Sequence, residues 1–202
     1  MAVINRARNF IFCHIYKTAG NSLRKIFSGE ELMGYHVEMA EVQDWYRQKG
    51  QLDYYNQAFK FSFVRNPTTW MVSLYEYIRG SKPHGYHEEI KRKSYREFLV
   101  WYRDVAMKLD RPFGANKYLT LTDFLCDGDG NLLVDFVGHV ERIQADVNQV
   151  CSRVGLKPRT VPNLNVGARR RKPNNMYYGE AERQLMREIF AEDYRRFNYP
   201  LP

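Results

Sequence analysis

The stretch FIFCHIYKTAGNSLRKIF, from Phe10 to Phe27, decides the fold class of this chain. The apolar segment from Asn9 to Tyr16 is typical of a buried strand, and the pattern from Asn21 to Phe27 is typical of a helix. A short turn of small and polar residues begins at Lys17 and joins the two. Helix N-termini carry unpaired N–H groups that bind anions. We therefore ask which anion this turn is suited to hold.

The residue types in this turn suit a phosphate-like ligand. Lys17 supplies a full positive charge, and the small Ala19 and Gly20 allow the backbone to approach a ligand. Side-chain donors are expected from three further residues, Thr18, Asn21 and Ser22. The turn differs from the GxxxxGK[ST] loop because its lysine precedes the glycine, and no Ser or Thr follows a lysine at the helix start to hold magnesium. An ordinary strand–turn–helix with a capping Asn or Ser is the alternative.

A second junction of the same kind lies in FKFSFVRNPTTWMVSLYEYIRG. The alternation from Phe59 to Val64 predicts a strand, and the stretch from Pro67 to Gly80 predicts a helix capped by Asn66. Arg65 lies at this junction, and Ser73 lies eight residues further, off the apolar stripe of the helix. A converging guanidinium and hydroxyl would clamp a second phosphate. Singly, a surface Arg and a helical Ser are the simpler interpretation, but two such turns indicate a ligand with two separated anionic groups.

Strand and helix patterns alternate along the chain, which predicts an α/β fold with a mainly parallel sheet. Further elements are expected at 39–49, from Ser94, at 143–155 and at 180–197 as helices, and at 132–138 as a strand after the turn CDGDGN. The chain has 202 residues, enough for one core, and shows no internal repeat. We therefore expect a single domain over residues 1–202.

Composition limits the partners and the compartment. The net charge of +8, from 31 Lys+Arg against 23 Asp+Glu, suggests a nucleotide, a nucleic acid, an anionic surface or an anionic glycan, although a solvated basic surface is an equal alternative. The three cysteines show no CxxC spacing, which argues against a disulfide framework and a zinc site and favours a reducing compartment. No stretch approaches the roughly 20 apolar residues of a membrane span.

As a pair, HIYKTAGNSL and FVRNPTTWMVSLY resemble the two cofactor motifs of the carbohydrate sulfotransferases, the Golgi-type family with its bacterial and viral relatives. Those enzymes use 3′-phosphoadenosine 5′-phosphosulfate (PAPS). Further similar blocks follow in family order and extend the resemblance over nearly the whole chain: LLVDFVGHVERIQADVNQV, LNVG, the Tyr177–Tyr178 pair and EDYRRFNYP. The resemblance implies a P-loop-like three-layer fold, with helices flanking the sheet.

The resemblance also implies roles for the two turns. Lys17 to Ser22 would hold the 5′-phosphosulfate of PAPS, and Arg65 and Ser73 would hold its 3′-phosphate, with adenosine 3′,5′-bisphosphate as the product. The sequence departs from the family at Tyr16, where Pro is common, and at His139, where Arg is frequent. Because the lysine, arginine and serine assigned to the nucleotide are all present, these departures bear on the acceptor and not on the donor.

Sulfuryl transfer resembles phosphoryl transfer and needs a cation at the leaving phosphate, for which we expect Lys17 to act as a catalytic residue. It also needs a base for the acceptor hydroxyl. In related enzymes the base comes from the segment between the two cofactor motifs. His36, in GYHVEMAEV, is our candidate for it, with Glu38 and Glu41 as alternatives. Because sulfate carries less charge than a terminal phosphate, we expect metal-independent transfer and no metal site.

The densest basic run, ARRRKP from Ala168 to Pro173, is by default a solvated loop. As a functional element, a lid over the nucleotide formed by Arg169–Lys172 is favoured over a grip on an anionic acceptor.

Two other functions compete with a sulfotransferase. A P-loop kinase-like nucleotide enzyme predicts magnesium dependence and a Walker-type loop. A nucleic-acid-binding module predicts basic residues interleaved with stacking aromatics, whereas Lys17 and Arg65 lie singly at strand ends. We therefore expect a nucleotide donor and a hydroxyl acceptor, a glycan by resemblance, and no nucleic acid. We expect a soluble protein without a transmembrane segment, cytoplasmic or, alternatively, the lumenal domain of a Golgi enzyme.

Overall fold

The computed structural model describes the whole chain except residues 35, 110–118 and 163–175. The chain divides into two compact units, the first formed by residues 1–65 and 121–166 and the second by residues 66–120 and 167–202. The single sulfotransferase domain expected over residues 1–202 stays a prediction. Of the helices within the described ranges, none combines the length and the apolar character needed to cross a membrane.

The first unit is built on a five-stranded sheet in the order β3-β1-β2-β4-β5. Its strands are β1 (Ala2–Asn5), β2 (Phe10–Cys13), β3 (Glu31–Met33), β4 (Phe59–Val64) and β5 (Phe136–His139). Strands β2, β4 and β5 run parallel, while β1 is antiparallel to β2 and β3 is antiparallel to β1. The predicted α/β class with a mainly parallel sheet is confirmed. The antiparallel pair at one edge had no counterpart in the sequence prediction.

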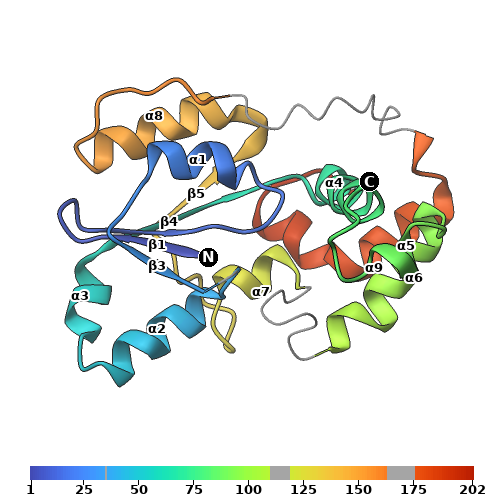
Figure 1. Ribbon diagram of the computed structural model, residues 1–202, viewed down its shortest axis with the longest axis horizontal. Helices are drawn as coiled ribbons and strands as arrows, with labels where there is room; N and C mark the ends of the chain where they lie inside the picture. The colour runs from blue at the N-terminus through green and yellow to red at the C-terminus, as the bar shows by residue number, and fades with distance from the viewer. Residues whose placement is uncertain (35, 110–118, 163–175) are drawn as a thin grey trace. The chain divides into compact units, whose positions relative to one another are not determined.

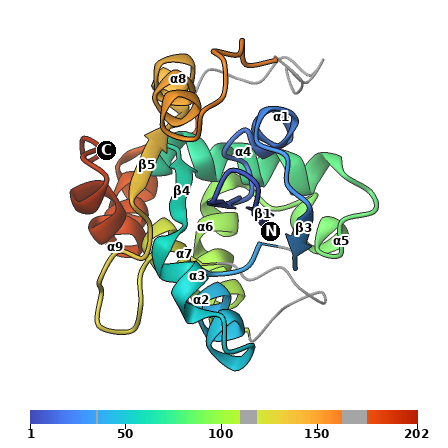
Figure 2. The ribbon, with the colours of Figure 1, turned by 90° about the vertical axis from the view of Figure 1, so that its left-hand side faces the viewer.

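Helices cover both faces of this sheet, α1 and α8 on one face and α2 and α3 on the other (Figures 1 and 2). The helices of the unit are α1 (Gly20–Ile26), α2 (Met39–Gln48), α3 (Leu52–Gln57), α7 (Leu121–Leu125) and α8 (Ile143–Arg153), with a 3₁₀ turn η2 (Val140–Arg142). Because both faces are covered, every residue of β2 is buried. The rings of Phe12 and Phe61 stack with centroids 5.1 Å apart, and Phe27 of the α1 C-cap meets Phe61 edge-on at 5.0 Å.

The strand predicted at 132–138 is shorter in the structure. Asp135 uses its carboxylate to accept the backbone N–H of Lys60 at 2.7 Å, and the Asp135 N–H donates to the Lys60 carbonyl at 2.7 Å. Leu132 forms an isolated bridge with Cys126 instead. The regular ladder with β4 therefore begins only at Phe136.

The second unit is helical. It contains α4 (Pro67–Gly80), α5 (His87–Ile90), α6 (Tyr95–Asp104), the 3₁₀ turn η1 (Ala106–Lys108) and α9 (Glu180–Arg196). The predicted inner face of α4 is confirmed by four buried residues, Met71, Leu74, Tyr75 and Ile78. Trp70 packs edge-on against Phe190 of α9 with centroids 5.9 Å apart. The helix expected from Ser94 ends at Asp104 and continues as η1.

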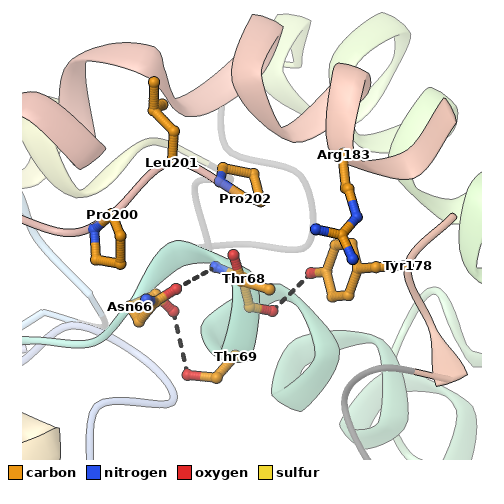
Figure 3. Close-up of a pocket in the computed structure, with 8 residues that line it drawn as sticks. All are labelled: Asn66, Thr68, Thr69, Tyr178, Arg183, Pro200, Leu201 and Pro202. Atoms are coloured by element: carbon orange, nitrogen blue, oxygen red, sulfur yellow. Dashed lines mark hydrogen bonds between the residues drawn. The ribbon is translucent and has the colours of Figure 1, made fainter. Parts of the chain in front are cut away.

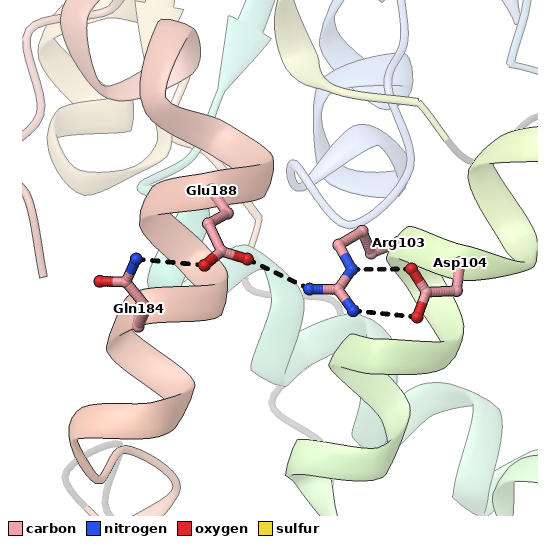
Figure 4. Close-up of polar contacts among 4 residues, drawn as sticks. All are labelled: Arg103, Asp104, Gln184 and Glu188. Carbon is pink, nitrogen blue, oxygen red and sulfur yellow. Dashed lines mark hydrogen bonds and ion pairs between the residues drawn. The ribbon is translucent and has the colours of Figure 1, made fainter.

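A polar network also joins α6 to α9 (Figure 4). The Arg103 guanidinium donates two hydrogen bonds to Asp104, at 2.7 and 2.9 Å, and a third to Glu188 at 3.1 Å. Glu188 in turn accepts a hydrogen bond from Gln184 at 3.1 Å. All four groups are solvent-accessible, so we assign most of the α6–α9 stability to buried contacts, such as that between the rings of Tyr102 and Phe190 with centroids 5.9 Å apart.

Candidate functional site

Three parallel strands of the first unit end at the same edge of the sheet. In the register of the ladders Cys13 pairs with Ser62, and Val64 pairs with His139. The turn after β2, residue Arg65 after β4, and the end of β5 therefore lie along one carboxyl edge. In open α/β sheets this edge is where ligands bind.

The turn after β2 has an unusual backbone. Lys17 and Ala19 both adopt left-handed conformations, with φ of 61° and 63°, and neither is glycine. No side chain caps α1, which begins at Gly20. Left-handed residues among right-handed ones turn successive N–H groups toward one side and create a concavity for an anion. Since such conformations cost of order 1–3 kcal/mol each, ordinary helix initiation does not account for this turn.

The side chains of this turn divide into inward and outward groups. Thr18 is buried and its hydroxyl donates to the Ile15 carbonyl at 2.8 Å, so in this conformation Thr18 offers a ligand its backbone N–H rather than its hydroxyl. Ser22 is also buried. Asn21 is exposed, and Lys17 is partly exposed.

Both helices that follow a predicted anion turn lack acidic residues in their first turns. Every other α-helix among the described residues has an Asp or Glu there. Acidic side chains normally occupy helix N-termini because they balance the partial positive charge. Their absence from α1 and α4 leaves both junctions electropositive, which suits an anionic ligand.

The second junction starts its helix in the ordinary way. Asn66 accepts the backbone N–H of Thr68 at 2.9 Å, and Pro67 occupies the first helical position. Arg65 is the last residue of the first unit, whereas Ser73, which is 2% exposed, belongs to the second. Their convergence on one phosphate stays a prediction.

A cavity of about 260 Å³ opens at the start of α4, within the second unit (Figure 3). It is lined by Asn66, Thr68, Thr69, Tyr178, Arg183, Pro200, Leu201 and Pro202. Tyr178 donates from its hydroxyl to the Thr68 carbonyl at 2.6 Å, and burial raises the pKa of that phenol. The hydroxyl groups of Thr68 and Tyr194 form a hydrogen bond with a length of 2.6 Å. Tyr178 and Tyr194 thus hold the first turn of α4. The sequence signalled this role only through two family blocks, the Tyr177–Tyr178 pair and EDYRRFNYP.

The candidate base, His36, lies against His14 and Tyr16, between the end of β2 and the first turn. Its Nδ1 is 3.3 Å from the His14 carbonyl, and its ring meets the rings of His14 and Tyr16 edge-on at 5.2 and 5.3 Å. Because a carbonyl only accepts, Nδ1 carries the hydrogen and Nε2 carries the lone pair. Burial lowers the pKa of His36 to about 4, so the imidazole is neutral near pH 7. It is in the protonation state that a general base requires.

The two alternative bases are engaged in helix capping. The Glu38 side chain accepts from the backbone of Glu41, and the Glu41 carboxylate accepts from the Glu38 N–H at 3.3 Å. This reciprocal pair is a capping box at the start of α2. It gives both carboxylates a structural role, which favours His36 as the base.

The structure adds His139 to the carboxyl edge. Its ring Nδ1 accepts from Arg142 at 3.1 Å, and its backbone N–H donates to Asp146 at 2.6 Å. Asp146, which is 2% exposed, also accepts from Arg142 at 3.0 Å. Sequence reasoning noted His139 only as a departure from the family pattern, and the signal that places it here is the parallel register of β4 and β5. The predicted lid, Arg169–Lys172, lies outside the described residues, as does the rest of Ala168 to Pro173.

Comparison with known proteins identifies the family. The model of the sulfotransferase family matches residues 1–200. This chain belongs to the sulfotransferase family. The predicted resemblance is thereby confirmed, and it covers nearly the whole sequence as expected.

Two relatives with similar sequences are named carbohydrate sulfotransferases. Human carbohydrate sulfotransferase 14 is 29% identical over 167 residues, covering 71% of this chain and 43% of its own length. The zebrafish protein of the same name, from Danio rerio, is 23% identical over 238 residues, covering 99% of this chain and 62% of its own length. The chain therefore spans about half of the length of these relatives.

A solved structure supports the fold. The crystal structure of mouse sulfotransferase SULT7A1 complexed with PAP aligns with a TM-score of 0.57 and 12% identity, over 96% of this chain and 87% of that one. At this identity the match shows the fold alone, and it confirms the three-layer α/β prediction.

Proposed function

We propose that this sulfotransferase-family chain transfers the sulfuryl group of PAPS to a carbohydrate hydroxyl. The observation that carries the proposal is the turn after β2, in a chain whose family match spans residues 1–200. This turn has a strained backbone and a lysine, and no acidic residue lies in the first turn of the helix that follows it. The names of the relatives favour a carbohydrate acceptor, and the PAP in the mouse structure favours a PAPS donor.

The residues present fit the donor. Lys17 and the N–H groups up to Ser22 would hold the 5′-phosphosulfate, and Arg65 with Ser73 would hold the 3′-phosphate. PAPS supplies an activated sulfuryl group whose leaving oxygen belongs to a phosphate. Lys17 acts by balancing negative charge at that oxygen. Arg65 and Ser73 act by fixing the far end of the nucleotide, and so align the reacting atoms.

His36 completes the mechanism as the base. With Nδ1–H bonded to the His14 carbonyl, Nε2 is the atom that takes the proton of the acceptor hydroxyl. The low pKa of His36 keeps its imidazole unprotonated, although it also makes the imidazole a weaker base. A weak base is sufficient here, because in-line transfer passes through a loose transition state.

Calorimetry with adenosine 3′,5′-bisphosphate, with and without magnesium, tests the donor site. The proposal predicts saturable binding that magnesium does not change, since Thr18, the residue after Lys17, lies before the start of α1 and donates its hydroxyl to the Ile15 carbonyl. A kinase-like enzyme would instead need magnesium. A nucleic-acid-binding module would favour an oligonucleotide over the bisphosphate.

Transfer itself is tested with radiolabelled PAPS and a panel of unsulfated oligosaccharides, in excess chelator. Label in a sugar supports the proposal, whereas transfer that appears only after magnesium is restored contradicts it. With an acceptor in hand, His36→Ala should lose about 10²–10⁴-fold in turnover and keep bisphosphate affinity. Glu38→Gln and Glu41→Gln serve as comparisons, and a larger loss in either would move the role of base to that residue.

A further inference from the structure

His14 lies directly against the first residue of α1. A Cβ added to Gly20 would be 1.6 Å from His14 Nε2 and 1.9 Å from its Cδ2. The backbone of Gly20 is in the ordinary helical range, because its φ is not among the positive values. Gly20 is therefore required here by the His14 ring and not by the backbone.

His14 also contacts the proposed base at two points. Its carbonyl accepts from His36 Nδ1 at 3.3 Å, which fixes the tautomer of His36. Its ring meets the His36 ring edge-on at 5.2 Å, with an interplanar angle of 67°. One residue thus contacts both the turn that follows β2 and the imidazole proposed to take the acceptor proton.

Packing contributes much of what holds the His14 ring in place. The side chain is buried, with 8% exposure, and its Nδ1 makes no hydrogen bond to any residue that the structure describes. Burial lowers its pKa to about 2, so the ring stays neutral. Because no hydrogen bond to a described residue anchors Nδ1, the position of the ring depends on its contacts with Gly20, with His36 and with Phe12, whose ring centroid is 6.3 Å away.

We propose that His14 is a positioning residue that couples the turn after β2, at Gly20, to the orientation and burial of His36. This inference rests on the proposed function in one respect only, that His36 is the base. When the ring of His14 moves, His36 gains water and loses its edge-on support, and Nε2 no longer faces the acceptor as required. A displacement of about 1 Å is enough to reduce turnover 10²-fold.

A two-residue cycle tests the coupling, with His14→Ala, Gly20→Ala and the double variant. The imidazole Cε1–H signal of His36 is followed by NMR from pH 3 to 8. In His14→Ala its pKa should rise from about 4 by at least one unit toward the ordinary value of about 6.5. Gly20→Ala should raise it too, because the new Cβ displaces the His14 ring, which meets the His36 ring. In the double variant, Gly20→Ala should add nothing, since the ring it would displace is absent.

Activity and binding provide the second readout. His14→Ala should lower turnover about 10²-fold and change the dissociation constant of adenosine 3′,5′-bisphosphate by no more than about threefold. His87→Ala is the matched control, since His87 Nδ1 also contacts a backbone carbonyl, that of Ile78 at 3.0 Å, in the second unit. It should leave the titration of His36 and the turnover unchanged.

An unchanged His36 titration in His14→Ala overturns the proposal, and so does full turnover in that variant. If Gly20→Ala does not fold, His14→Ala alone gives the same decision. Failure of the proposed function looks different. The wild-type protein would then transfer no sulfuryl group from PAPS, while the coupling between residues 14, 20 and 36 would still be measured by NMR.

Discussion

The turn after β2 and the start of α4 each connect a parallel strand to a helix, but their backbones begin the helix in different ways. The start of α4 uses Asn66 as a cap and Pro67 at the first position, both of which stabilise a helix. The turn after β2 has no side-chain cap and holds Lys17 and Ala19 in left-handed conformations.

The difference separates structural from functional explanations. Helix initiation explains every residue from Asn66 to Thr68, so nothing in that backbone calls for a ligand. It does not explain Lys17 or Ala19, whose conformations persist only because the surrounding contacts fix them. We infer that the turn after β2 carries the demanding part of the chemistry, and that the start of α4 contributes mainly through the residues on either side of it.

The largest expected effect comes from Lys17→Gly, which removes the charge and the backbone strain together. Turnover with PAPS should fall by about 10²-fold or more, while the free energy of unfolding should rise by up to about 1 kcal/mol as the positive φ becomes unstrained. Steady-state assays and urea unfolding measure the two.

Asn198→Gly is the matched control for that strain, since Asn198 is exposed and has a φ of 55° after α9. It should stabilise slightly and leave turnover unchanged. If Lys17→Gly kept the turnover of the wild type, Lys17 and the turn after β2 would have no part in catalysis.

The next effect concerns the far end of the nucleotide. Arg65→Ala should weaken adenosine 3′,5′-bisphosphate binding by about 2 kcal/mol, roughly 30-fold, as the loss of a charge-assisted hydrogen bond would. Adenosine 5′-phosphosulfate lacks the 3′-phosphate, so its affinity should hardly change. Calorimetry with both nucleotides checks this, and an equal loss for the two would show that Arg65 does not read the 3′-phosphate.

The pH profile tests His36 by an intermediate effect. A base works when deprotonated, so activity is lost as pH falls through its pKa, which burial lowers to about 4. Turnover should therefore be flat from pH 7 to about pH 5, whereas an unperturbed histidine would already lose about tenfold at pH 5.5.

Acid unfolding must be separated from that loss. The unfolded chain protonates His36 near pH 6.5 and the folded chain only near pH 4, so the contribution of His36 to stability is full above 6.5 and declines as pH falls toward 4. Circular dichroism at each pH provides the check, and an acid limb near pH 6.5 in a fully folded protein would exclude His36 as the base.

The sequence predicted best where local chemistry decides the structure. Strand β4 and helix α4 were placed to the residue, because alternation, Asn66, Pro67 and Gly80 each act over a few positions. Strands β1 and β3 were missed. β3 has three residues, and its extended form depends on pairing with β1, a contact between distant segments that no local pattern encodes.

The candidate site divides in the same way. Lys17, Arg65 and His36 could be selected from residue type and order along the chain. The contact of His14 with Gly20 could not, because it depends on the path that the left-handed Lys17 and Ala19 impose on the turn. The capping box of Glu38 and Glu41 was not readable from the sequence, because Glu38 is not among the residue types that usually cap helices.

The smallest expected effect is that of Asn66→Asp, which keeps the cap and changes only the charge. Asp caps helices as well as Asn does, so the free energy of unfolding should stay within about 0.5 kcal/mol of the wild type, whereas Asn66→Ala should lose about 1 kcal/mol. A carboxylate beside Arg65 would oppose the bound 3′-phosphate by about 1 kcal/mol at close range in water, which is about fivefold in bisphosphate affinity. Ser94→Asp adds the same charge at the N-cap of α6, a residue with no proposed part in donor binding, and should leave affinity unchanged. Equal affinity of Asn66→Asp and the wild type for the bisphosphate would mean that no anion binds at the start of α4. Ligand binding would then be confined to the turn after β2, and the start of α4 would serve only to begin its helix.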